Sequence, residues 1–150
     1  HRDLHSFPTR RSSDLPIEVL EGVRETIEEL SKEYELFLIT KGDLLDQEAK
    51  LARSGLGDYF KAFEIVPNKN PKTYKYVLRR HQINADEFVM VGNSLRSDIL
   101  PVLEIGAKAV FIPYETEWFH EKVSDEELIG KDFGRIEKMN DLINWLKNFK

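Results

Sequence analysis

The chemistry-bearing residues of this chain stand where apolar stretches give way to turns. They are Thr40, Lys69, Asn93 and Asp98. Asn93 and Asp98 directly follow the apolar run Phe88–Val91 and a glycine. Two oxygen-bearing side chains at the end of a strand suit a hard cation such as magnesium. A simpler interpretation is that both residues only cap the helix that follows, as turn residues of these types often do.

The stretch Val89–Leu103 predicts a buried strand that hands over directly to a helix. Its first residues are β-formers, and the run breaks at Gly92. Ser94 is placed to cap the helix. The inner face of this helix is predicted from Ile99, Val102 and Leu103, and its end from Gly106.

The rest of the chain alternates helices and strands in the same way. Strands are predicted at Glu35–Thr40, Ala62–Val66 and Ala109–Pro113, and helices from Pro16, from Asp43 to about Ser54, and from Asn70 and Pro71. The predicted inner face of the first helix is Ile17, Leu20, Val23, Ile27, Leu30 and Tyr34. That of the third helix is Tyr74, Val77, Leu78 and His81. That of the closing helix is Ile136, Met139, Leu142, Ile143, Leu146 and Phe149, with Asp141 near its start. Strands alternating with helices at short spacing imply an α/β fold with a parallel sheet and right-handed crossovers.

The carboxyl ends of parallel strands share one edge of a sheet, so the four polar residues are expected to gather there. A hydroxyl, an ammonium group and two oxygen ligands in this order are what phosphoryl transfer needs. A lone lysine such as Lys69 is most often solvated surface. The combination, rather than any one residue, therefore indicates the chemistry.

Composition excludes several other classes. The 150 residues, 41% hydrophobic and 33% charged, fit one globular domain, and the net charge of -5 argues against nucleic acid or an anionic membrane as partner. The absence of cysteine excludes disulfides and cysteine-based zinc sites. The same absence fits a reducing cytoplasm, where we expect the protein. No apolar run is long enough to span a bilayer. The oligomeric state of the protein is open.

Residues 1–15 differ from the rest, being polar, basic and without apolar periodicity. The segment HSFPTRRSSDL within them resembles the translation of a common sequencing adapter. We therefore expect residues 1–15 to be an artefactual or disordered extension and residues 16–150 to form a partial core domain. The alternative is a basic arm that binds an acidic partner.

Three motifs make residues 16–150 resemble the haloacid dehalogenase superfamily of phosphohydrolases. LFLITKGD is similar to the second family motif, with Thr40 as the phosphate-binding hydroxyl. VPNKNPKTY supplies the lysine of the third motif, best matched by Lys69, with Lys72 as a less favoured register. VMVGNSLRSD is similar to the fourth motif, and the flanking phrases SGLGDYF and IGAKAVFIPY fit as well.

The resemblance implies a Rossmann-like three-layer α/β/α sandwich, a Mg²⁺ cofactor and a small phosphorylated metabolite as substrate. Thr40 and Lys69 would orient and neutralise the phosphoryl group, with Lys41 as a further phosphate-binding candidate and Ser94 as a second-tier one. Asn93 would hold the metal directly or through water. Asp98 would either support the metal or position Lys69, and the sequence leaves both roles open.

Two departures from the family pattern matter. No Asp-x-Asp motif occurs in the chain, so the nucleophile, the central first strand of the sheet that carries it, and the cap domain are expected to be missing. The chain as written is then expected to be inactive. Asn93 also replaces the usual first aspartate of the fourth motif, and its amide oxygen can ligate magnesium but brings no charge.

Two alternatives fit the helix–strand pattern. A non-catalytic flavodoxin-like module of the receiver type would need an aspartate at the end of a central strand, whereas the predicted strands end at Thr40, Val66, Gly92 and Pro113. A dinucleotide-binding domain would need a G-x-G-x-x-G turn, and none follows a strand.

Overall fold

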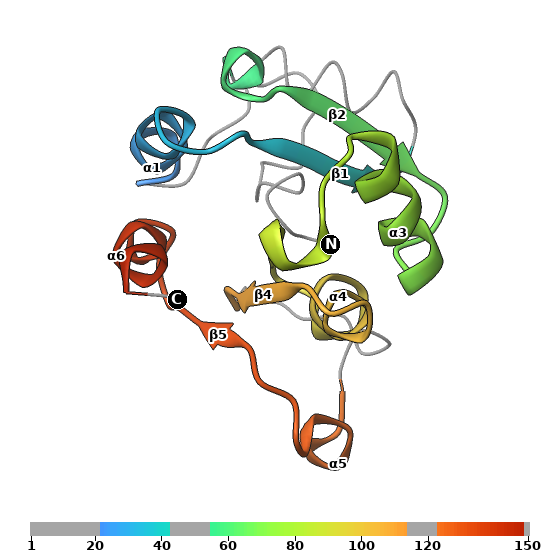
Figure 1. The fold of residues 1–150 in the computed structure, drawn as a ribbon. Coiled ribbons are helices and arrows are strands. Elements are labelled where there is room, and N and C mark those ends of the chain that lie inside the picture. The colour runs from blue at the N-terminus through green and yellow to red at the C-terminus, as the bar shows by residue number, and fades with distance from the viewer. Residues whose placement is uncertain (1–21, 43–54, 114–122, 149–150) are drawn as a thin grey trace. The chain divides into compact units, whose positions relative to one another are not determined.

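The computed structural model describes residues 22–42, 55–113 and 123–148. These residues form an α/β fold with parallel strands, divided into two compact units (Figure 1). The described residues of the first unit come from Leu4–Pro67 and Lys138–Lys150, and those of the second from Asn68–Glu137. We name them the β1–β2 unit and the β3–β5 unit after the parallel sheet that each contains.

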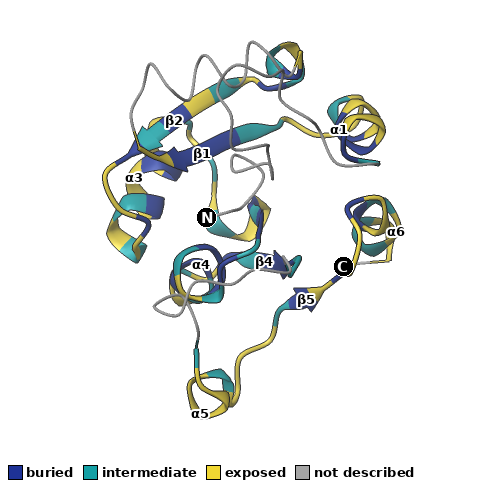
Figure 2. Cartoon of the chain, turned by 180° about the vertical axis from the view of Figure 1, so that it is seen from behind, coloured by how far each residue is buried: buried dark blue, intermediate teal, exposed yellow. Residues whose placement is uncertain are grey.

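The β1–β2 unit has a two-stranded parallel sheet. β1 (Phe37–Lys41) pairs with β2 (Ala62–Val66) in the register Phe37↔Ala62 to Lys41↔Val66. The helices α1 (Val23–Ser31) and α6 (Asp141–Lys147) contact each other, and a short helix, η1 (Gly57–Tyr59), contacts α1. Figure 2 shows the centre of β1 as buried, which follows from its run of apolar residues and Thr40.

Both strands predicted for this unit are confirmed to within two residues. The bounds of β2 are those predicted, whereas β1 begins two residues later and ends one later than predicted. Tyr34 was wrongly placed on the inner face of the first helix, because α1 ends at Ser31 and Tyr34 is 45% exposed in the turn that follows. The closing helix begins only at Asp141, so Met139 is buried ahead of it rather than on it; Ile136, also predicted on this helix, is buried within the β3–β5 unit.

Some predicted features lie outside the described residues. These are the start of the first helix at Pro16 with Ile17 and Leu20, the helix from Asp43 to Ser54, the end of the closing helix at Phe149, and residues 1–15. They remain predictions from the sequence.

The β3–β5 unit has a sheet in the order β3-β4-β5, and all its pairings are parallel. Its strands are β3 (Val89–Gly92), β4 (Lys108–Phe111) and β5 (Gly134–Arg135), and its helices are α3 (Pro71–Arg80), η2 (Ala85–Glu87), η3 (Leu95–Ile99), α4 (Leu100–Glu104) and α5 (Asp125–Leu128). The short β5 was not predicted, since two residues give no alternating pattern. α3 packs against α4, which also contacts β4, whereas α5 is largely exposed (Figure 2).

The core of this unit combines the predicted inner faces of its helices with buried residues of β3 and β4. Tyr74, Val77 and Leu78 of α3 are buried, while His81 is the half-buried C-cap of that helix.

No helix in the described part of the chain has the length and apolar character needed to cross a bilayer.

The single helix predicted after β3 is wrong in detail, because the segment starts with a π-helical turn. η3 covers Leu95–Ile99, and only then does α4 begin. Ile99 and Val102 are fully buried as predicted, whereas Leu103 is half-buried. Pro101 has no N–H group, so the carbonyl of Ser97, four residues earlier, lacks its usual α-helical donor. This interruption of the α-helical hydrogen bonds coincides with the wider π-helical turn.

Candidate active site

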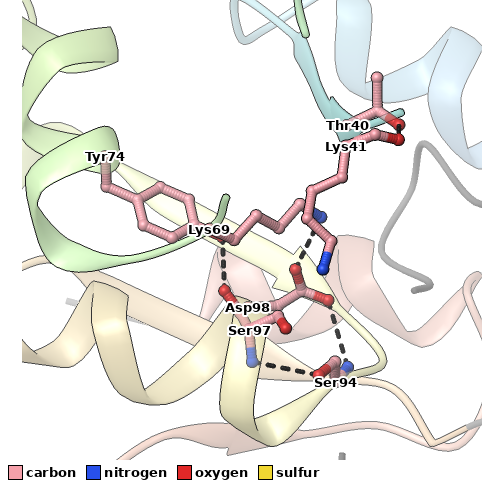
Figure 3. A network of polar contacts seen from close by, with 7 residues as sticks. All are labelled: Thr40, Lys41, Lys69, Tyr74, Ser94, Ser97 and Asp98. Carbon is pink, nitrogen blue, oxygen red and sulfur yellow. Dashed lines mark hydrogen bonds and ion pairs between the residues drawn. The ribbon is translucent and has the colours of Figure 1, made fainter. Parts of the chain in front are cut away.

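A buried ion pair joins the residue before α3 to the turn η3 within the β3–β5 unit. The Lys69 ammonium donates to the Asp98 carboxylate, with Nζ 2.8 Å from Oδ1 (Figure 3). The two side chains are 2% and 0% exposed. Removing both charges from water is costly, so such a pair persists only where good geometry and further hydrogen bonds compensate.

The start of α3 fixes the position of Lys69. Asn70 is the N-cap, and its side-chain oxygen accepts a hydrogen bond from Thr73 N at 2.8 Å. Pro71 occupies the first helical position, where its missing N–H costs nothing. Lys69 therefore stands immediately before the helix, while Lys72 lies within it and is exposed.

The turn η3 fixes Asp98 on the other side of the pair. The Ser94 backbone N–H donates to Asp98 Oδ2 at 3.1 Å, and Ser94 Oγ accepts from Ser97 N at 3.1 Å. Ser94 thus caps the turn as predicted. Asp98 does bond the backbone at the helix start, as the capping interpretation holds, but its second oxygen is committed to Lys69.

Gly92 ends β3 directly beneath the carboxylate. A Cβ atom added at Gly92 would lie 2.3 Å from Asp98 Oδ2 and 2.5 Å from its Cβ and Cγ. Real Cβ atoms do not approach other heavy atoms this closely, so only glycine leaves room for the Asp98 side chain. Glycine is therefore required at the end of β3 because any larger residue would collide with the Asp98 side chain.

Tyr74 belongs to the same network, although the sequence indicated only a core residue. Its side chain is 1% exposed, and its hydroxyl donates to the Ser97 carbonyl at 2.8 Å (Figure 3). Burial, and to a smaller extent the charge of the Asp98 carboxylate, raises the pKa of the Tyr74 phenol well above its usual value. The available signal was a tyrosine at an inward-facing position, because a buried phenol needs a partner.

Thr40 and Lys41 lie in the other unit, at the carboxyl end of β1. Thr40 is buried, and its hydroxyl donates to the Lys41 carbonyl at 3.1 Å, whereas the Lys41 side chain is exposed. The structure thus brings Lys69, Ser94 and Asp98 together within the β3–β5 unit and defines Thr40 and Lys41 within the β1–β2 unit. The predicted gathering of all of them at one sheet edge remains a prediction.

The oxygen donors of the β3–β5 unit match magnesium in kind but not in number. Asn93 follows Gly92 and is half-buried. Its amide oxygen is one of the ligand types that bind Mg²⁺. Both oxygens of Asp98 already accept hydrogen bonds from nitrogen donors. The described residues hold no cluster of three or more His, Cys, Asp or Glu side chains. A complete magnesium site would therefore need oxygen ligands beyond these.

Two curated relatives are phosphatases. The chain is 35% identical over 99 residues to glyceraldehyde 3-phosphate phosphatase of Pyrococcus furiosus, a match over 62% of this chain and 41% of that protein. It is 31% identical over 94 residues to human N-acylneuraminate-9-phosphatase, a match over 59% of this chain and 38% of that protein. The chain thus spans less than half the length of these relatives.

A solved structure and a family model agree with these matches. A haloacid dehalogenase-like family hydrolase from Xanthomonas campestris superimposes with a TM-score of 0.76 at 38% identity, over 89% of this chain and 55% of that one. The family model of haloacid dehalogenase-like hydrolases matches residues 7–112, a span that contains the Lys69–Asp98 pair. On this evidence the chain belongs to the haloacid dehalogenase-like hydrolase family.

Proposed function

We propose that the intact protein hydrolyses small phosphate monoesters. The observation that carries this proposal is the buried Lys69–Asp98 ion pair in a chain of this family. An ammonium group held in place out of water is a preorganised positive charge, which stabilises the charge that develops on a transferring phosphoryl group. Family membership supports the reaction class, and the ion pair supports its location.

In this proposal Lys69 neutralises the phosphoryl oxygens and Asp98 keeps its ammonium in position. The contact of 2.8 Å between these side chains favours this role for Asp98 over a purely metal-binding one. Thr40 would donate its hydroxyl to a phosphate oxygen from the end of β1, with Lys41 as a further phosphate-binding group. Ser94 acts through its hydrogen bonds to Asp98 and the start of η3.

The nucleophile is proposed to come from a segment upstream of this chain. An aspartate carboxylate there would attack phosphorus, the ester P–O bond would break, and the leaving alcohol would take a proton. Water would then hydrolyse the aspartyl-phosphate, releasing phosphate and restoring the carboxylate. In support, the chain contains no Asp-x-Asp motif and covers 41% of its relative from Pyrococcus furiosus.

The missing segment would also supply a central strand. Among the described residues, β1 pairs with β2 and β3 pairs with β4, which leaves one side of β1 and one side of β3 for a further strand. We further propose that residues 16–150 are part of one core domain and that residues 1–15 are foreign to it, because these are polar, basic and without apolar periodicity; the family match itself begins at residue 7. The segregation of the strands into two sheets supports a missing first strand.

Magnesium is proposed as the cofactor of the intact protein. Asn93 would hold it through its amide oxygen, and Asp98 would contribute through its carboxylate, with further ligands from the upstream segment. When bound, such an ion withdraws charge from the phosphoryl oxygens and orients the substrate. This chain's own residues position the phosphoryl group and balance its charge.

The substrate is proposed to be a small phosphorylated metabolite. By their names, the two phosphatase relatives act on compounds of different size, a triose phosphate and an N-acylneuraminate phosphate. The shared feature is a phosphate monoester on a small polar molecule, and this is the class that we carry over.

The test compares two proteins with p-nitrophenyl phosphate and magnesium. The chain as written should show no turnover, because positioning groups do not replace the covalent step. The protein extended by its genomic upstream segment should turn the substrate over, and exchange of Asp by Asn within the Asp-x-Asp of that segment should abolish the activity. Turnover by the 150-residue chain itself, or none by the extended protein, would contradict the proposal.

Replacing Asn93 by aspartate should strengthen magnesium binding in the intact protein. A carboxylate adds a negative charge to a ligand that is now a neutral amide, so the magnesium concentration for half-maximal turnover should fall by about tenfold. The matched control is Asn84→Asp, which adds the same charge at the N-cap of η2, where aspartate caps equally well. An equal magnesium dependence in both variants would remove Asn93 from the metal site.

A further inference from the structure

The hydrogen bond from the Tyr74 hydroxyl to the Ser97 carbonyl has no role in the function proposed above. Tyr74 follows Lys69 on the first turns of α3, with its side chain 1% exposed. Its hydroxyl donates to the carbonyl of Ser97 in η3 at 2.8 Å (Figure 3). The hydrogen bond therefore joins the helix that follows Lys69 to the turn that carries Asp98.

The peptide group between Ser97 and Asp98 is held on both sides. Its carbonyl accepts from the Tyr74 hydroxyl, and its N–H, that of Asp98, donates to the Ser94 carbonyl at 2.8 Å. The Asp98 side chain leaves from the Cα next to this peptide. The orientation of the peptide therefore sets the direction in which the carboxylate points.

The sequence of the turn explains why a side chain serves as donor here. In an α-helix the Ser97 carbonyl would accept from the N–H four residues later. That residue is Pro101, which has no N–H. A hydroxyl that reaches in from α3 supplies a donor at the point where the regular ladder is interrupted and η3 takes its π-helical form.

We propose that Tyr74 is a positioning residue of the phosphohydrolase site, and that its hydroxyl orients the Ser97–Asp98 peptide so that Asp98 holds the Lys69 ammonium in place. This inference rests on the proposed function. Tyr74 acts through Asp98 and does not itself touch the substrate.

The first experiment is Tyr74→Phe in the intact protein, assayed with p-nitrophenyl phosphate. The ring remains and only the hydroxyl is lost, so kcat should fall by about tenfold or more while KM stays nearly unchanged. The matched control is Tyr76→Phe, on the same helix but 53% exposed, which should keep the wild-type kcat. Equal kcat values for the two variants would overturn the proposal.

A second comparison separates positioning from packing. Val77→Ala loosens the buried face of α3 without touching the hydroxyl. It should lower the melting temperature and leave kcat close to the wild-type value. In the Asp98→Asn background, Tyr74→Phe should cost little further kcat, because a residue that acts through Asp98 has nothing left to position. A full additional loss in that background would overturn the proposal.

A readout without turnover keeps this inference distinct from the proposed function. The Lys69 ammonium is buried and paired, so it should give a slowly exchanging signal in proton–nitrogen NMR of the lysine side chains, assigned by its loss in Lys69→Met. Tyr74→Phe should shift this signal and speed its exchange, whereas Tyr76→Phe should not. If Tyr74→Phe does not fold, the exchange of the Tyr74 hydroxyl proton in the wild type decides, and fast exchange would overturn the inference.

Absence of turnover in the wild-type intact protein would remove the proposed function. The NMR comparison would still decide whether Tyr74 holds the Lys69–Asp98 pair. Normal turnover together with an unperturbed Lys69 signal in Tyr74→Phe would remove the inference alone.

Discussion

Gly92→Ala should abolish turnover in the intact protein and destabilise the fold. The new Cβ would lie 2.3 Å from Asp98 Oδ2 and 2.5 Å from its Cβ and Cγ, so the Asp98 side chain has to move. Overpacking of this kind typically costs about 1–3 kcal/mol, and displacement of Asp98 from Lys69 adds to it. Urea unfolding measures the loss of stability, and the p-nitrophenyl phosphate assay measures the loss of turnover.

Gly106→Ala is the control for this variant. Gly106 has φ +85, but an added Cβ there would meet nothing within 4 Å. It should cost about 1–2 kcal/mol of stability through backbone strain and keep the wild-type kcat. The steric explanation further requires that Gly92→Ala add little to the loss caused by Asp98→Ala, because the colliding atoms are then largely removed. Fully additive losses would contradict it.

The second large effect is expected from breaking the buried ion pair on one side. Lys69→Met leaves the Asp98 carboxylate buried without its cation, and Asp98→Asn leaves the Lys69 ammonium without its anion. Each should lower the free energy of unfolding by about 3–5 kcal/mol. Each should also reduce turnover of the intact protein by at least about tenfold, or about 1.4 kcal/mol in barrier.

The double variant Lys69→Met/Asp98→Asn distinguishes the two losses. Neither charge remains buried, so much of the stability should return, while turnover should not, because the cation is absent. Recovery of both would show that the pair serves only the fold.

The surface pair Lys61–Glu35 provides a control with similar geometry. Its charged atoms lie 2.9 Å apart, but its side chains are 56% and 64% exposed. Lys61→Met should therefore change stability by no more than about 1 kcal/mol and leave turnover unchanged. Burial rather than distance is what makes the Lys69–Asp98 pair sensitive, and a Lys69→Met loss as small as that of Lys61→Met would contradict this.

The amino-acid sequence by itself determined the local elements and the family. Asn70 and Pro71 marked the start of α3, apolar runs marked β2 and β3 closely, and Ser94 marked the cap of η3, because capping and β-propensity act between residues near in sequence. The motifs around Thr40, Lys69 and Asp98 pointed to the family that the comparisons then showed.

Only the tertiary structure decided what these residues do to one another. The family resemblance left open whether Asp98 supports a metal or positions Lys69, and the sequence indicated Tyr74 only as a core residue. In the structure Lys69 pairs with the Asp98 carboxylate 29 positions away, and Tyr74 bonds a carbonyl 23 positions away. The π-helical turn and the space beneath Asp98 at Gly92 were equally invisible. The physical reason is that propensities and caps depend on neighbours along the chain, whereas ion pairs, buried hydroxyls and close backbone approaches depend on which elements the fold packs together.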